Sequence, residues 1–150
     1  MEQKIEQTRK NLKLTSIIIL VFAAFTALQA ATSIFTDFSV DMLPEGASEN
    51  LILISQIFLA VITVLVLIPQ VYVGVRGLQL AKNPVFCKAH IVWAIILLAV
   101  SVLALISPVI NIVENGGVKD NMLTIFSILA EALAYVDFII YAKALNKAEN

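Results

Sequence analysis

The chain has 150 residues, of which 60% are hydrophobic and 14% are charged, and its formal net charge is −1 at pH 7. A soluble domain usually carries about 25% charged residues, and a chain this apolar could not cover its own surface with polar groups. The composition therefore predicts a membrane protein. The net charge argues against nucleic-acid binding, which needs a basic face. The single cysteine excludes an internal disulfide and the cysteine-based zinc patterns.

Four long apolar runs, separated by short polar stretches, predict four transmembrane helices. About 20 apolar residues are needed to cross a hydrocarbon core about 30 Å thick, and the backbone groups must be hydrogen-bonded within each segment. Residues 1–150 are thus expected to form a single domain, an all-α integral membrane four-helix bundle. The predicted spans, with approximate boundaries, are residues 14–35, 51–75, 90–113 and 122–142.

The basic residues predict the orientation of these spans. Nine of the ten lie before the first span, between the second and third, or after the fourth, and only Lys119 lies in another connection. The positive-inside rule then places both termini in the cytoplasm, so that each half of the chain is an in-out-in hairpin in the cell membrane. Eight lysines against two arginines, with abundant isoleucine, hint at a bacterium with an AT-rich genome.

Small residues on one face of each predicted helix indicate where the helices pack. Lipid tails are as apolar as leucine, so membrane helices associate through small residues and hydrogen-bonding side chains. When each run is turned by 100° per residue, such faces emerge on all four, which predicts a compact bundle with these faces turned inward. The expected helix-packing seam comprises Ala23, Ala27, Ala30, Ala60, Gly74, Ala130 and Ala134.

Two acids fall inside the fourth predicted span, and Glu131 lies about midway along it. A central acid costs about 2.5–3.5 kcal/mol to insert, whereas each Leu, Ile, Phe or Val returns about 0.3–0.6 kcal/mol. The fourth span is therefore marginal alone, and we expect Glu131 to be protonated or hydrogen-bonded. Matched depths along the second and fourth spans place Glu131 between Gln56 and Thr63, and Asp137 between Thr63 and Gln70.

This polar seam has two interpretations. Ionisable groups inside membranes usually mark pathways or relays, which predicts a proton or cation site. Alternatively, a hydrogen-bonded acid serves only to lock the helices together. Under the first interpretation, the candidate site comprises Glu131, Asp137, Gln56, Thr63 and Gln70.

Three further residues carry structural expectations. Pro69 and Pro108 can kink their helices, because proline lacks a backbone N–H and its ring crowds the preceding turn. His90 is expected to be an interfacial polar residue. A lone histidine is a poor signal for metal binding, so neither a metal nor another cofactor is expected.

The motifs of the common enzyme classes are missing from the sequence. It contains no Gly-x-Ser-x-Gly, no His-Glu-x-x-His and no glycine-rich phosphate loop, so we expect no catalytic residues. Two function classes remain. The leading hypothesis is an accessory or scaffold protein that acts through helix–helix contacts in a membrane complex. The alternative is a small oligomeric transporter or channel, coupled to protons or cations through Glu131 and Asp137. Expected partners are membrane lipid and either a second copy or another membrane protein.

Cys87 is the only thiol of the chain and lies in the central connection, whose orientation it therefore reports. A membrane-impermeant maleimide should leave intact cells unlabelled and should label inside-out vesicles, because the positive-inside rule places this connection in the cytoplasm. Labelling of intact cells would establish the opposite orientation.

Overall fold

The computed structural model describes residues 2–35, 49–83, 88–115 and 118–148, and Cys87 lies outside this part of the chain. Four of its helical segments are long and apolar enough to cross a membrane, namely Glu2–Thr32, Asn50–Lys82, Ala89–Glu114 and Asn121–Ala148. The all-helical fold with four such helices is therefore confirmed. The helices are α1 (Glu2–Phe35), α3 (Glu49–Lys82), α4 (Ala89–Ala104), α5 (Ile106–Asn115) and α6 (Val118–Ala148).

The third span is divided into α4 and α5 at Leu105. The backbone N–H of Leu105 donates to the carbonyl of Val102 at 3.3 Å, a tighter bond than the regular helical one. Pro108 follows three residues later, and its ring crowds the carbonyl of Ala104, where α4 ends. Pro69, in contrast, lies inside α3 without dividing it. Of the two prolines, Pro108 is the one that interrupts its span.

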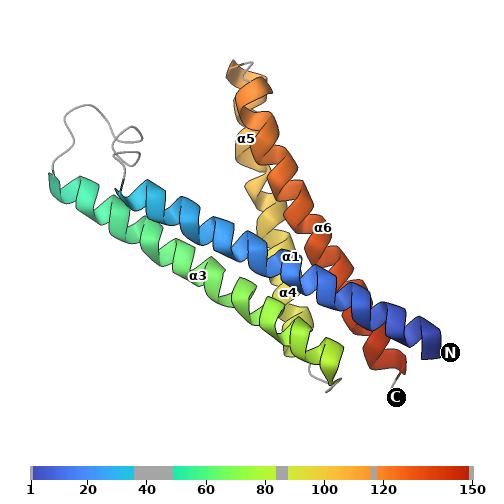
Figure 1. Ribbon diagram of the computed structural model, residues 1–150. Coiled ribbons are helices and arrows are strands. Elements are labelled where there is room, and N and C mark those ends of the chain that lie inside the picture. Colours follow the sequence, from blue (N-terminus) through green and yellow to red (C-terminus); the bar gives the residue numbers. More distant parts are fainter. Residues whose placement is uncertain (1, 36–48, 84–87, 116–117, 149–150) are drawn as a thin grey trace.

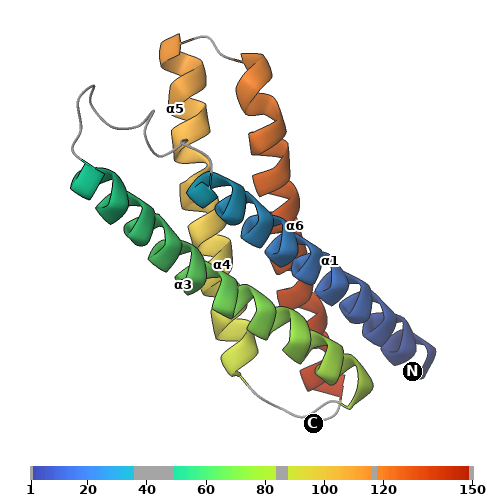
Figure 2. The same cartoon turned by 60° about the vertical axis from the view of Figure 1, so that its left-hand side comes forward.

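The five helices form two hairpins that cross each other. Helices α1 and α3 lie side by side as the first hairpin, and α4 and α5 pair with α6 as the second (Figure 1). The hairpins cross near the end that carries both termini, which we call the terminal end. They diverge toward the opposite end, which we call the loop end (Figure 2). Helix α1 packs against both α3 and α6, whereas α3 and α6 lie diagonally and share few contacts.

Close packing of all four spans is confined to the crossing, in the terminal half of the molecule. The helices approach one another closely at Gly77, where an added Cβ would overlap Ser16 of α1 and Phe138 of α6. The Ser16 hydroxyl donates to the Leu12 carbonyl at 2.7 Å, so this buried polar group is satisfied within its own helix. The largest fully buried side chains are Tyr135, Phe138, Leu12, Ile19, Leu145, Gln70, Val73 and Ser16.

His90 also belongs to the core of the crossing. Its side chain is 2% exposed, and its ring packs edge-on against Phe138 with a centroid distance of 6.0 Å. The first turn of α4 lies beside α6, which covers the side chain of His90.

Outside the crossing, large apolar side chains are exposed along the helices. On α3, for example, Phe58 and Leu65 are each 65% exposed, and on α6 Leu133 is 64% exposed. Soluble proteins rarely expose continuous apolar surface on this scale. The exposed side chains of these helices therefore suit an apolar environment.

Replacement of Gly77 tests the close crossing. Gly77→Ala should lower the free energy of unfolding by about 1–3 kcal/mol, the usual cost of overpacking a core, and this outweighs a helix-propensity gain of about 1 kcal/mol. Gly74→Ala is the control and should cost less, because its Cβ would mainly meet the flexible side chain of Leu20. Thermal unfolding in detergent measures both changes. Unchanged stability of Gly77→Ala would contradict the crossing.

Candidate functional site

The carboxyl group of Glu131 connects the two hairpins. Gln70 of α3 donates from Nε2 to Glu131 Oε1 of α6 at 2.6 Å, and the Tyr135 hydroxyl donates to the same oxygen at 2.8 Å. Gln70 is 1% exposed, Tyr135 is fully buried and Glu131 is half-buried. We call these three residues the acid cluster. Since α3 and α6 share few other contacts, the Gln70–Glu131 bond joins the hairpins across their diagonal.

The crossing determines which residues meet in the acid cluster. Gln70 lies seven residues before Gly77, and Glu131 lies seven residues before Phe138, which is about two turns of the same helix face in each case. Both helices run from the loop end to the terminal end, so residues two turns before the crossing lie at the same level. Tyr135 is four residues after Glu131 and therefore shares its face of α6.

The acid cluster provides hydrogen-bond donors to Glu131 but leaves one buried acceptor, Gln70 Oε1, without a donor among the described residues. Two donors, Gln70 Nε2 and the Tyr135 hydroxyl, converge on one carboxyl oxygen of Glu131. Gln70 Oε1 is buried and accepts no hydrogen bond from any of the described residues. A buried amide oxygen without a donor is costly. The cluster therefore has the capacity to accept one more hydrogen bond.

A polar cleft of about 650 Å³ opens from the acid cluster toward the loop end, between α1 and α6. Its lining residues belong to α1 and α6. The hairpins that contain these two helices diverge toward the loop end (Figure 2). Glu131 is the lining residue of α6 nearest the terminal end, and beyond it the buried Ala134 and Tyr135 belong to the crossing. The cleft is lined by the aromatic Phe22, Phe25 and Phe126, the polar Thr26, Gln29, Thr124, Ser127 and Glu131, and the aliphatic Leu123 and Ile128.

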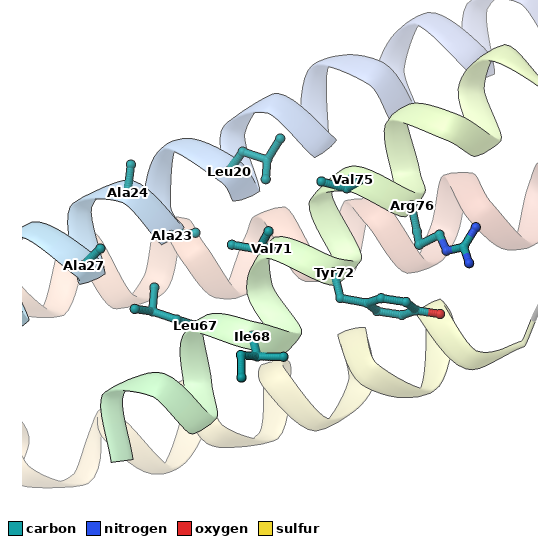
Figure 3. A pocket seen from close by; sticks show the side chains of 10 residues that line it. All are labelled: Leu20, Ala23, Ala24, Ala27, Leu67, Ile68, Val71, Tyr72, Val75 and Arg76. Carbon is teal, nitrogen blue, oxygen red and sulfur yellow. The ribbon is translucent and has the colours of Figure 1, made fainter. Parts of the chain in front are cut away.

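A second groove, between α1 and α3, has a different character. Its volume is about 680 Å³, and aliphatic side chains such as Ala24 and Leu67 line most of it (Figure 3). Its polar groups are those of Tyr72 and Arg76, and the guanidinium carbon lies 5.8 Å from the centre of the Tyr72 ring. This lining suits the hydrocarbon tails of lipids and offers no acid, whereas the polar cleft holds the carboxyl group of Glu131.

The structure brings together two of the five residues of the candidate proton or cation site, Gln70 and Glu131. Gln56 and Thr63 are half-buried nearer the loop end of α3, and the Thr63 hydroxyl donates to the Leu59 carbonyl of its own helix at 2.9 Å. The predicted levels of these residues assume that the second and fourth spans are parallel. Helices α3 and α6 cross at an angle instead, so Glu131 lies level with Gln70.

Asp137 lies apart from the acid cluster. It follows Glu131 by six residues, a rotation of about 120° away from that face of the helix. Its side chain is exposed. Within one chain, Asp137 and Glu131 therefore face different surroundings.

The residues of the expected packing seam differ in burial, and their burial does not simply follow the distance from the crossing. Ala27 is more open than Ala30, which lies farther toward the loop end on the same helix. Ala23, Gly74 and Ala134 are buried, Ala30 and Ala60 are half-buried, and Ala27 and Ala130 are exposed.

Tyr135 is the member of the acid cluster that the sequence reasoning missed. Its four-residue spacing from Glu131 was a usable signal, since side chains at this spacing meet on a helix surface. In the described part of the chain, no three His, Cys, Asp or Glu side chains come close enough together to hold a metal ion.

Comparison with known proteins finds no match, whether to a protein-family model, a curated protein or a solved structure. The fold defines the class of this protein, which is all-helical with four helices long and apolar enough to cross a membrane.

The shared acceptor of the acid cluster predicts non-additive mutations. Tyr135→Phe should lower the free energy of unfolding by about 0.5–1.5 kcal/mol, the usual net contribution of a single hydrogen bond. The double variant with Gln70→Leu should differ from the sum of the single variants by at least about 0.5 kcal/mol, because both side chains bind one oxygen.

Thermal unfolding in detergent gives these values, and Thr63→Val is the control. Its hydroxyl bonds only to its own helix backbone in this structure, so its effect should add to that of Tyr135→Phe. Strict additivity of Gln70→Leu and Tyr135→Phe would contradict the acid cluster.

Proposed function

We propose that this chain is a small accessory protein of a membrane complex and receives a transmembrane helix of its partner in the polar cleft. The proposal includes insertion of the four long helices in the cell membrane with both termini in the cytoplasm. Lys82 ends α3, Lys88 directly precedes α4, and Lys143 and Lys147 lie in the last turns of α6. These helix ends lie at the terminal end (Figure 1), which supports this orientation by the positive-inside rule.

The observation that carries the proposal is the polar face of α6 in the cleft. Thr124, Ser127 and Glu131 lie on one face of the helix and line the cleft with Gln29 of α1. Polar side chains that face lipid tails without partners are costly. A helix seated in the cleft would cover them and could bond to them, as small and polar residues do between membrane helices.

The closed end of the cleft supports a binding role. The tightly packed crossing begins directly beyond Glu131, with Ala134 6% exposed and Tyr135 and Phe138 fully buried. An occupant of the cleft can thus reach the acid cluster from the loop end but meets a packed core there. The spare acceptor of Gln70 Oε1 and the carboxyl group of Glu131 favour an occupant that presents hydrogen-bond donors.

A second candidate function is a small oligomeric transporter coupled to protons or cations. The half-buried carboxyl group of Glu131, which opens into a cleft, favours it, because intramembrane acids often mark such pathways. Asp137 would then act from another face, toward a second copy of the chain or another pathway.

A photo-crosslinking amino acid tests the accessory role. Placed at Ser127, in the cleft, it should trap one defined membrane protein in cells. At Leu133, which is 64% exposed on the opposite side of α6 from Glu131, it should not trap that protein. Glu131→Gln should weaken co-purification of the trapped protein about five- to thirty-fold, the loss of one or two hydrogen bonds between membrane helices.

Asp137→Asn is the matched control, since it makes the same chemical change outside the cleft and should leave co-purification unchanged. Equal trapping from Ser127 and Leu133 would contradict the cleft as the binding surface. If the purified chain alone in proteoliposomes instead carries a pH- or cation-dependent flux that Glu131→Gln abolishes, the transporter candidate replaces the accessory role.

A further inference from the structure

The acid cluster leaves one carboxyl oxygen of Glu131 open. Gln70 and Tyr135 both donate to Oε1, whereas Oε2 accepts no hydrogen bond from the described residues. Glu131 is half-buried and lines the polar cleft, so an occupant of the cleft reaches its side chain. We propose that the partner helix carries a lysine inside its membrane-spanning segment, and that the ammonium group of this lysine pairs with Glu131. The inference rests on the proposed function, because it assigns the chemistry of the same partner.

The described part of the chain brings no cation to Glu131. The ten residues that line the polar cleft include no lysine, arginine or histidine. The side chains that bond to the carboxyl group, Gln70 and Tyr135, are an amide and a phenol. Acids inside membranes commonly pair with a group of opposite charge, because an isolated charge in lipid is costly. We therefore expect the opposite charge to come from the occupant of the cleft.

The open atoms of the acid cluster are acceptors. Glu131 Oε2 has no donor among the described residues, and neither has Gln70 Oε1, whose side chain is 1% exposed. An ammonium group has three donors and no acceptor, so it complements a cluster that lacks donors. Its charge also attracts the carboxylate, and this attraction is stronger in a medium of low dielectric constant than in water. A cation is therefore favoured over a neutral amide.

The arrangement of the bonds favours lysine over arginine. An arginine binds a carboxylate most strongly through two parallel hydrogen bonds, one to each oxygen. Each carboxyl oxygen has about two lone-pair positions, and Gln70 and Tyr135 occupy those of Glu131 Oε1. Only Oε2 is left, which suits the compact ammonium group of lysine. The apolar stem of a lysine also suits the aromatic part of the cleft, where Phe22 and Phe126 lie.

The extent of the polar cleft favours a lysine on a helix over a free amine. Its lining on α6 runs from Leu123 to Glu131, nine residues or about 12 Å of helix. On α1 it runs from Phe22 to Gln29. A free ammonium compound would need only the closed end at Glu131. A helix would cover this whole length and place one side chain at the acid.

Synthetic transmembrane peptides test the lysine. The full chain, with a photo-crosslinking amino acid in place of Ser127, is reconstituted in phosphatidylcholine nanodiscs with leucine–alanine helices whose central residue is Lys, Gln or Leu. Titration of the cross-link should show at least about ten-fold tighter binding of the Lys peptide than of the other two, the usual effect of a hydrogen bond to a charged group. Glu131→Gln should abolish this preference. Asp137→Asn is the matched control and should keep it, because Asp137 lies outside the cleft.

Equal binding of the Lys and Gln peptides to the chain with Glu131 intact would overturn the inference, and this comparison needs no variant of the acid. Tighter binding of a peptide with a central Arg would overturn it as well. So would displacement of the Lys peptide by dodecylammonium at the same concentration in the nanodisc, since a free amine would then suffice.

The protein that Ser127 traps in cells separates this inference from the proposed function. Its sequence should contain a lysine within a membrane-spanning segment. A trapped partner without such a lysine would overturn the inference and leave the accessory role standing. If no partner is trapped while the Lys peptide is still preferred, the accessory role alone is contradicted.

Discussion

A carboxyl group in the middle of an apolar helix needs hydrogen-bond donors, and Glu131 finds them on its own helix and on α3. The bonds from Gln70 and Tyr135 converge on one of its oxygens, at 2.6 and 2.8 Å. The two hairpins pack mainly through α1 against α6 and α3 against α4, and this small cluster adds a polar link between α3 and α6, which share few other contacts. The polar cleft opens from this cluster.

The acid cluster depends in turn on the close crossing at Gly77. Only a residue without a side chain fits between Ser16 and Phe138, and this approach sets the level at which α3 and α6 face each other. On the terminal side of the crossing the helices are packed, and on the loop side they diverge into the polar cleft. The same geometry therefore gives the polar cleft a closed end at the packed crossing and an open end on the side of the loop end. The proposed binding role rests on this arrangement.

The sequence was sufficient to predict the helices but not the contacts between them. Length and apolarity predicted four spanning helices because these properties belong to each segment alone, and Pro108 carried a local signal for the break after α4. The partner of Glu131 depends on how two hairpins cross, which no single segment encodes. Counting along parallel helices therefore placed Glu131 between Gln56 and Thr63, which lie about four and two turns before Gln70. Tyr135 lay within reach of a local argument, since its four-residue spacing from Glu131 was visible in the sequence.

The distance between the Gln70 side-chain nitrogen and the Glu131 carboxyl carbon in lipid bilayers is the most direct test of the acid cluster. Solid-state NMR measures it as a dipolar coupling between side-chain ¹⁵N-labelled glutamine and carboxyl-¹³C-labelled glutamate. We expect a strong coupling in the wild type that disappears in Gln70→Leu, because the two groups share a hydrogen bond. A wild-type spectrum without this coupling, or one that Gln70→Leu leaves unchanged, would contradict the link between the hairpins.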